Sequence, residues 1–319
     1  MHTAFAEDVN ILNQLQSNLE GCIMGKEREV ELLLTAVLAG GNILLEDVPG
    51  TGKTVLIKAL ARSVQGRFQR IQCNPDLLPT DVTGVSMYHP KQEMFRFRPG
   101  PIFSNIVLID EINRASTKTQ SALLEAMEER QVSVDGECYP LPEPFLLLAT
   151  QNPIDFEGTY TLPEAQMDRF MLKFHLGYPG HETEKRILLA QETDHPVDRI
   201  EPVVTIERLT QMQERAKRVH VDEAIVDYIV SIVRSSREHP AVYLGASPRA
   251  SVAMMQAAKA RAYLRSRDYV IPDDIKDLTP FVLGHRLILR PEAKFDGNGL
   301  ESIIESILLQ VGVPVAMGK

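Results

Sequence analysis

The amino-acid sequence predicts an α/β fold, with a parallel sheet and helices on both of its faces, followed by a smaller all-α domain. In the first half of the chain, short apolar segments alternate with longer segments of helical periodicity. Such alternation is typical of a parallel sheet covered by helical layers. After LGYPG at 176–180 only helical patterns remain. A chain of 319 residues also exceeds the usual size of one compact domain.

Three apolar segments predict strands of the sheet. They are residues 42–46, 106–111 and 145–150, and each is apolar on successive residues. Strands of a parallel sheet have this pattern because both of their faces are buried. Residues 54–64 and 119–130 have the spacing of helices and lie between the strands.

The second half of the chain predicts helices alone, and the Pro and Gly residues at 176–180 mark a domain boundary. We therefore expect an α/β domain at 1–178 and a helical domain at 179–319. The expected helices are 182–192, 206–219, 222–238, 247–267 and 272–287.

Two segments interrupt the first domain. Residues 131–140 alternate in character around Asp135 and Gly136, a residue pair that strongly indicates a two-residue β-hairpin turn. Residues 81–103 combine alternation at 94–98 with a cluster of Pro and Gly. Taken alone, either segment could equally be an ordinary surface loop.

The composition disfavours several classes of protein, namely membrane-spanning, secreted, disulfide-rich, zinc-binding and nucleic-acid-binding proteins. Hydrophobic residues make up 44% and charged residues 24%, and no run of about 18 apolar residues occurs, so we expect no membrane span. The first residues lack the pattern of a secretory signal, which favours a cytoplasmic protein. Three scattered cysteines indicate neither a disulfide framework nor a zinc site. The formal net charge of −9 disfavours nucleic acid as a partner.

A phosphate-binding loop is predicted at EDVPGTGKT, residues 46–54, between an apolar strand and an apolar helix. Gly50 and Gly52 allow backbone N–H groups to approach phosphates, Lys53 supplies a positive charge, and Thr54 supplies a hydroxyl to Mg²⁺. The generic pattern begins with glycine, whereas this chain has Asp47 there. The predicted cofactor-binding residues of this loop are Asp47, Val48, Pro49, Gly50, Thr51, Gly52, Lys53, Thr54 and Val55.

Two carboxylates end the strand segment at 106–111. Asp110 can hold the same Mg²⁺ as Thr54, and Glu111 is placed to polarise water. Two carboxylates alone could be a solvated strand end. Together with the phosphate loop they predict an ATPase that uses ATP and Mg²⁺, with Thr54 and Asp110 as metal ligands.

Several longer blocks carry a resemblance to the MoxR family of AAA+ ATPases, over about residues 20–290. These blocks are LEDVPGTGKT at 45–54, VLIDEINRA at 107–115, ALLEAMEERQVSVDG at 122–136, LLATQNP at 147–153, LPEAQMDRF at 162–170 and GASPRA at 245–250. The resemblance implies an AAA+ P-loop NTPase core followed by a helical lid domain. It also implies that Asp47 is ordinary in this loop.

The resemblance further implies roles for three residues outside the loop. Asn152 matches the sensor that orients the attacking water, Arg169 the arginine finger that reaches a neighbouring subunit, and Arg249 the second sensor. Whether Arg249 acts on its own or a neighbouring subunit stays open, and an ion pair with Glu164 or Asp168 is the alternative for Arg169. Arg114 could face a subunit interface or form a salt bridge.

The same resemblance implies names for the two interruptions and a partner class. Residues 81–103 look like the helix-two insert, and residues 131–140 like the hairpin before the first sensor. The base of ATP would lie near residues 23–25. A homo-hexameric ring acting on protein clients is the family expectation, with von Willebrand A domain proteins and enzymes awaiting metal insertion among such clients.

Two other functions are compatible with these residues. A DNA-directed motor would use Lys91, Arg96 and Arg98 of the insert, although these cations could equally form a solvated rim. A nucleotide-gated scaffold would bind ATP with little turnover, and Glu111 argues against this scaffold because a proton acceptor is needed only for hydrolysis.

Overall fold

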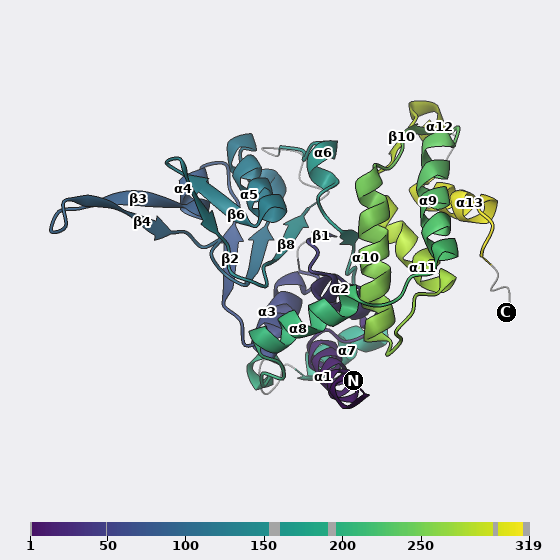
Figure 1. Ribbon diagram of the computed structural model, residues 1–319, viewed down its shortest axis with the longest axis horizontal. Helices are drawn as coiled ribbons and strands as arrows, with labels where there is room; N and C mark the ends of the chain where they lie inside the picture. Colours follow the sequence, from purple (N-terminus) through teal and green to yellow (C-terminus); the bar gives the residue numbers. More distant parts are fainter. Residues whose placement is uncertain (1, 49, 153–159, 191–195, 296–298, 315–319) are drawn as a thin grey trace. The chain divides into compact units, whose positions relative to one another are not determined.

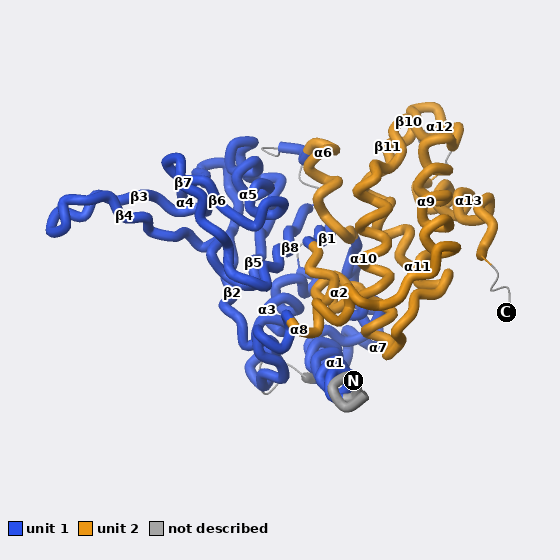
Figure 2. The backbone as a smooth tube through the Cα atoms, in the orientation of Figure 1, with its two compact units in different colours: residues 1–31, 42–162, 174–210 blue, residues 32–41, 163–173, 211–319 orange. Residues whose placement is uncertain are grey.

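The structure is a computed structural model that describes residues 2–48, 50–152, 160–190, 196–295 and 299–314. The chain divides into two compact units, coloured blue and orange in Figure 2. Unit 1 comprises residues 1–31, 42–162 and 174–210, and unit 2 comprises residues 32–41, 163–173 and 211–319.

A five-stranded sheet forms the centre of the α/β part, with strand order β2-β5-β8-β1-β9 (Figure 1). The pairs β2/β5, β5/β8 and β1/β8 are parallel, as predicted. Every residue of β5 is buried, which explains why residues 106–109 are all apolar. The strands are β1 (Ile43–Glu46), β2 (Phe68–Gln72), β5 (Ile106–Asp110), β8 (Leu146–Gln151) and β9 (Leu172–Phe174).

The helices around this sheet begin at identifiable signals. α3 follows Gly52, whose φ of 92° is left-handed, and α5 begins after Ser116, whose side chain accepts a bond from the Thr119 N–H. The helices of unit 1 are α1 (His2–Cys22), α3 (Lys53–Ser63), α4 (Pro79–Thr83), α5 (Thr117–Glu129) and α7 (His181–Ala190), with 3₁₀ turns η1 (Ile112–Arg114) and η2 (Pro196–Arg199). Two more helices, α2 (Glu27–Ala39) and α8 (Ile206–Lys217), each begin in unit 1 and end in unit 2.

Both interruptions of the first domain are antiparallel hairpins. The first pairs β3 (Gly84–His89) with β4 (Met94–Pro99), and the second pairs β6 (Gln131–Val134) with β7 (Glu137–Pro140). Asp135 and Gly136 have φ of 52° and 83°, the two positive values that a type I′ turn requires. The rings of Phe97 and Tyr139 stack with centroids 4.0 Å apart, so the two hairpins contact one another.

Unit 2 is built mainly of helices. α9 (Glu223–Glu238) begins at Asp222, whose carboxylate accepts a bond from the Ala224 N–H, and α10 (Pro248–Leu264) packs against α9 and against α11 (Pro272–Leu283). The other helices are α6 (Glu164–Met167), α12 (Pro291–Phe295) and α13 (Leu300–Gln310). A short antiparallel ladder, β10 (Val242–Leu244) with β11 (Ile288–Leu289), adds to the helices that the sequence predicts.

The sequence-based boundary after residue 178 falls inside unit 1. The Ser63 carbonyl at the end of α3 accepts bonds from the N–H groups of Val203 and Val204, at 2.8 and 3.2 Å, which fixes this later segment to unit 1. Conversely, residues 32–41 and 163–173 belong to unit 2. Hydrogen bonds between segments so far apart in the sequence leave no local Pro or Gly pattern from which the unit boundary could be predicted. Among the described residues no helix combines the length and the hydropathy that a membrane crossing requires.

Candidate functional site

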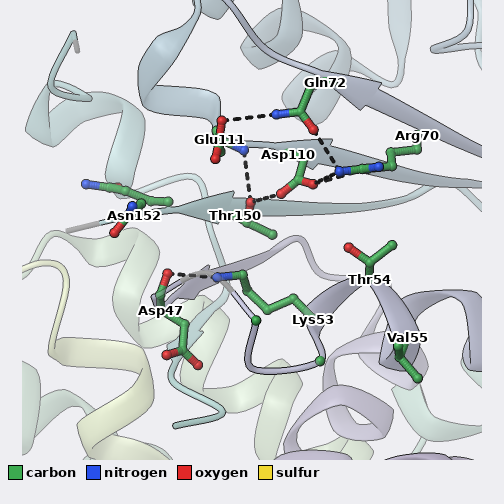
Figure 3. A pocket seen from close by; sticks show the side chains of 13 residues that line it. Asp47, Lys53, Thr54, Val55, Arg70, Gln72, Asp110, Glu111, Thr150 and Asn152 are labelled. Atoms are coloured by element: carbon green, nitrogen blue, oxygen red, sulfur yellow. Dashed lines mark hydrogen bonds and ion pairs between the residues drawn. The ribbon is translucent and has the colours of Figure 1, made fainter. Parts of the chain in front are cut away.

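A cavity of about 390 Å³ lies in unit 1 where four parallel strands end (Figure 3). The phosphate loop follows β1, Gln72 ends β2, Asp110 ends β5 and Gln151 ends β8. Parallel strands present their carboxyl ends at one edge of the sheet, where α/β proteins bind ligands. The lining residues are Asp47, Gly50, Gly52, Lys53, Thr54, Val55, Arg70, Gln72, Asp110, Glu111, Thr150, Gln151 and Asn152.

The phosphate loop adopts the backbone that its glycines predict. Gly50 and Gly52 have φ of 85° and 92°, in the left-handed region. The Lys53 ammonium donates to the carbonyl oxygens of Asp47 and Val48, at 2.7 and 2.8 Å. Burial lowers the pKa of Lys53, and the charges of Asp47, Asp110 and Glu111 oppose that shift. Pro49 lies outside the described residues.

Asp47 anchors the loop through its carboxylate, which points away from Lys53 (Figure 3). Oδ1 accepts from the Val48 N–H at 2.9 Å, and Oδ2 accepts from the N–H groups of Leu176 and Gly177 at 2.9 and 2.8 Å. Asp47 is only 7% exposed. Glycine, the generic residue here, could make none of these bonds.

Thr150, near the end of β8, orients the last residue of β5, Asp110, and the residue after it, Glu111. Its hydroxyl donates to Asp110 Oδ1 at 2.5 Å and accepts from the Glu111 N–H at 2.9 Å. Glu111 has φ of 56° and ψ of 54°, a sparsely populated conformation that turns the chain off the strand. The sequence did not single out Thr150, because a threonine at a strand end is common.

Arg70 and Gln72 of β2 also belong to this network, and sequence reasoning missed both. Arg70 Nε and Nη2 donate to Asp110 Oδ2 at 3.1 and 2.5 Å. Gln72 Nε2 donates to Glu111 Oε2 at 3.1 Å, and so does Arg114 Nη1 at 3.2 Å. Arg114 therefore forms the salt bridge that was one of its two sequence-based alternatives. The usable signal was the polar alternation of FQRIQ at 68–72 beside the Asp110 strand.

Cys73, which follows Gln72, is chemically inert in this setting. Cys73 is 1% exposed, and burial together with the charges of Asp110 and Glu111 raises the pKa of its thiol to about 12. A thiol with this pKa stays protonated at neutral pH and is a poor nucleophile.

Asn152 follows β8 and lines the same cavity, with 8% of its surface exposed. The structure therefore brings together the phosphate loop, Asp110, Glu111 and Asn152 within unit 1. The other two predicted catalytic residues, Arg169 after α6 and Arg249 in the first turn of α10, belong to unit 2.

A second cavity, of about 220 Å³, adjoins the phosphate loop and shares Gly50, Gly52 and Val55 with the first. Ile23 is among its lining residues, and a Cβ at Gly52 would lie 3.1 Å from Ile23 Cδ1, so only glycine fits there without displacement. The lining comprises Cys22, Ile23, Met24, Lys26, Gly50, Thr51, Gly52, Val55, Gly177, Pro179, Ile187 and Pro196. Its mostly apolar side chains suit a flat aromatic group beside the phosphate site.

The donor set of the main cavity fits Mg²⁺ held together with phosphates. Asp110 and Thr54 both line it. Nowhere in the described parts of the chain do three or more His, Cys, Asp or Glu side chains gather as a metal cage. Mg²⁺ usually retains several waters and takes one or two carboxylates plus phosphate oxygens, so one carboxylate and one hydroxyl are sufficient protein ligands.

Comparisons with known proteins agree with this geometry. Residues 42–172 match the ATPase family associated with various cellular activities (AAA), and residues 234–307 match the AAA lid domain. The chain is 52% identical to the YeaC protein of Bacillus subtilis, with 98% of each chain covered. It is 42% identical to the chaperone MoxR1 of Mycobacterium tuberculosis, covering 97% of this chain and 84% of that protein.

A third relative and a solved structure extend the comparison. The protein MoxR of Methylorubrum extorquens is 30% identical, covering 87% of this chain and 88% of that protein. A structure from Cytophaga hutchinsonii, of a protein named as a candidate ATPase, has a TM-score of 0.91 and 37% identity, with 98% of each chain covered. The predicted family and fold class are confirmed, and the chain belongs to the MoxR family of AAA+ ATPases.

Proposed function

We propose that this protein hydrolyses ATP with Mg²⁺ and uses the reaction, in a ring of identical subunits, to remodel protein clients. The observation that carries the proposal is the meeting of Lys53, Asp110, Glu111 and Asn152 at one cavity at the edge of the sheet. The groups that bind phosphate and the groups that activate water therefore face the same cavity. Phosphoryl transfer to water requires the phosphate and the attacking water to be held next to each other.

The phosphate loop supplies the binding half of the reaction. Its backbone N–H groups and the N-terminal end of α3 attract the phosphates. Lys53 exchanges its contacts with the Asp47 and Val48 carbonyls for β and γ phosphate oxygens. The base occupies the second cavity beside Ile23 and Met24. Asp110 and Thr54 hold the Mg²⁺, which neutralises phosphate charge when bound.

Glu111 supplies the hydrolytic half by accepting a proton from the attacking water, which Asn152 orients. Gln72 and Arg114 both donate to Glu111 Oε2, which fixes the carboxylate side chain. A positioned general base of this kind contributes roughly 10² to 10⁴-fold in rate.

Arg169 and Arg249 of unit 2 complete the catalytic set, Arg169 as an arginine finger that acts on the nucleotide of a neighbouring subunit. A contact that must come from the next copy implies a head-to-tail interface, and such interfaces form a ring when the rotation between copies closes. We propose a homo-hexamer. The name of the related chaperone MoxR1 supports protein clients, and partners with von Willebrand A domains or enzymes that await metal insertion are the client classes to examine.

The proposal is tested by measuring Mg²⁺-dependent ATP hydrolysis and ATP affinity in the purified protein and in Lys53→Ala. Loss of the ammonium removes charge-assisted bonds to phosphate, and we expect about a hundredfold weaker ATP binding. Lys58→Ala is the matched control, because Lys58 is an exposed lysine of the same helix. Absence of ATP hydrolysis in the parent protein, or equal ATP affinity in both variants, would count against the proposal.

Asp47→Gly restores the generic loop pattern, yet we expect it to weaken the protein. The substitution removes the acceptor of three backbone N–H groups, two of them at Leu176 and Gly177. The loss of three hydrogen bonds to a buried carboxylate should lower the free energy of unfolding by about 2 to 4 kcal/mol. Chemical denaturation measures the loss, and isothermal titration measures a parallel fall in ATP affinity. A glycine variant as stable as the parent protein would show that the Asp47 anchor is dispensable.

A further inference from the structure

Asp168, the residue before Arg169, joins two separate segments of unit 2. Its Oδ1 accepts from Arg286 Nε at 2.8 Å, and its Oδ2 accepts from the Ser247 hydroxyl at 2.7 Å. Arg286 follows α11, and Ser247 is the N-cap of α10. One carboxylate therefore contacts both the end of one helix and the start of another.

Arg286 fixes the backbone on both sides of Arg169. Its Nη2 donates to the carbonyl oxygens of Asp168 and Phe170, at 2.9 and 2.7 Å. The Arg286 side chain is 2% exposed, and a third carbonyl, that of Val282 in α11, accepts from Nη1 at 2.5 Å. A buried guanidinium with several partners in fixed directions allows its neighbours little freedom. The main chain at Arg169 is thus held against α11.

Ser247 connects the same carboxylate to Arg249. While its hydroxyl donates to Asp168, its Oγ accepts from the Arg249 N–H at 3.1 Å. The preceding Ala246 is also held, because its N–H donates to Ser236 Oγ and its carbonyl accepts from Arg237 Nε, both in α9. The first turn of α10, which carries Arg249, therefore has a fixed place relative to Asp168.

We propose that Asp168 is a positioning residue that couples the Arg169 segment to the first turn of α10, so that Arg169 and Arg249 move as one body. This inference rests on the catalytic roles proposed above for the two arginines. It assigns the Asp168–Ser247–Arg286 cluster the task of holding the main chain at Arg169 and the first turn of α10 in one fixed arrangement. A change of α10 then displaces both arginines together instead of one alone.

Substitutions of Ser247 test the coupling without removing the helix cap. Serine, threonine and aspartate are all favourable N-caps, so the start of α10 is retained in both the aspartate and the threonine variant. Ser247→Asp places a second carboxylate against Asp168, which repels it, whereas Ser247→Thr keeps the hydroxyl. Removing Arg286 instead would deprive the half-buried Asp168 carboxylate of its ion pair and three main-chain carbonyls of their donor, which could prevent folding.

Hydrogen exchange of the full chain provides the first readout. In Ser247→Asp we expect amide exchange at 168–170 to be faster by roughly tenfold or more, the equivalent of losing one charge-assisted bond. These amides are well suited to the measurement, because their N–H groups bond to Glu164, Gln166 and Met167 carbonyls. Ser247→Thr should exchange like the parent protein. Unchanged exchange at 168–170 in the aspartate variant would overturn the coupling.

ATP turnover provides the second readout. We expect Ser247→Asp to lower kcat by roughly tenfold with little change in KM. Ser247→Thr should have the kcat of the parent protein. In a protein that carries Arg169→Ala and Arg249→Ala, adding Ser247→Asp should lower kcat no further, because the groups that it displaces are gone. An equal fall in that background would overturn the proposal. If the two arginine substitutions themselves leave turnover unchanged, their proposed roles fail, while the exchange result still decides the coupling.

Discussion

Arg169→Ala is expected to lower ATP turnover by roughly a thousandfold or more in the assembled protein while ATP affinity stays within about twofold of the parent. An arginine finger stabilises charge that develops on the phosphoryl group in the transition state, so its loss affects kcat far more than ground-state binding. Arg169 belongs to unit 2, whereas every residue that lines the phosphate cavity belongs to unit 1. Steady-state hydrolysis and nucleotide titration measure the two quantities.

The matched control is Arg234→Ala, which removes an arginine of unit 2 whose side chain is 71% exposed. We expect that variant to hydrolyse ATP at the rate of the parent protein. Size-exclusion chromatography with ATP present shows whether Arg169→Ala still assembles, which separates loss of catalysis from loss of the ring.

Mixing distinguishes donation by a neighbour from action within one subunit. A subunit with Arg169→Ala keeps a complete phosphate cavity, and a subunit with Glu111→Gln keeps a complete arginine segment. In mixed rings some interfaces combine the two intact halves, so activity should recover and should be greatest near equal proportions. Failure to recover at any ratio would place Arg169 outside the neighbour's site.

The centre of the sheet could be predicted from the sequence because burial on both faces leaves an unbroken apolar run. Segments 42–46, 106–111 and 145–150 correspond to β1, β5 and β8. β2 has the burial pattern of a strand with one exposed face, and its FQRIQ sequence contains no such run. Arg70 and Gln72 were missed for the same reason, since their partners Asp110 and Glu111 lie 40 and 39 residues away.

The residues that orient the site depend on contacts between distant segments. Asp47 was noticed as a departure from the loop pattern, but its partners Leu176 and Gly177 lie 129 and 130 residues further along the chain. Arg286 bonds to an aspartate 118 residues away, and LGHR at the end of a helix gives no hint of it. Local patterns predict elements and motif residues, whereas anchoring bonds are set by tertiary packing.

Glu111→Gln should retain ATP binding and lower turnover by roughly 10² to 10⁴-fold, the contribution of a positioned general base. Glutamine has the shape of glutamate, and its side-chain oxygen can still accept the bonds that Gln72 and Arg114 donate to Glu111 Oε2. The variant therefore keeps the geometry of the network and loses only the proton acceptor. Single-turnover hydrolysis with radiolabelled ATP measures the chemical step, and titration without turnover measures affinity.

Two comparisons make the result of Glu111→Gln decisive. Glu129→Gln neutralises an exposed carboxylate of α5 and should hydrolyse ATP like the parent. Asp110→Asn neutralises the carboxylate that Thr150 and Arg70 contact, and should weaken Mg²⁺-dependent ATP binding as well as turnover. If Glu111→Gln turned over at the parent rate, Glu111 would not be the base. If Glu111→Gln instead weakened ATP binding as Asp110→Asn does, the two carboxylates would share a binding role. Asp110 is the metal ligand and Glu111 the proton acceptor only if the first substitution weakens binding and the second lowers kcat alone.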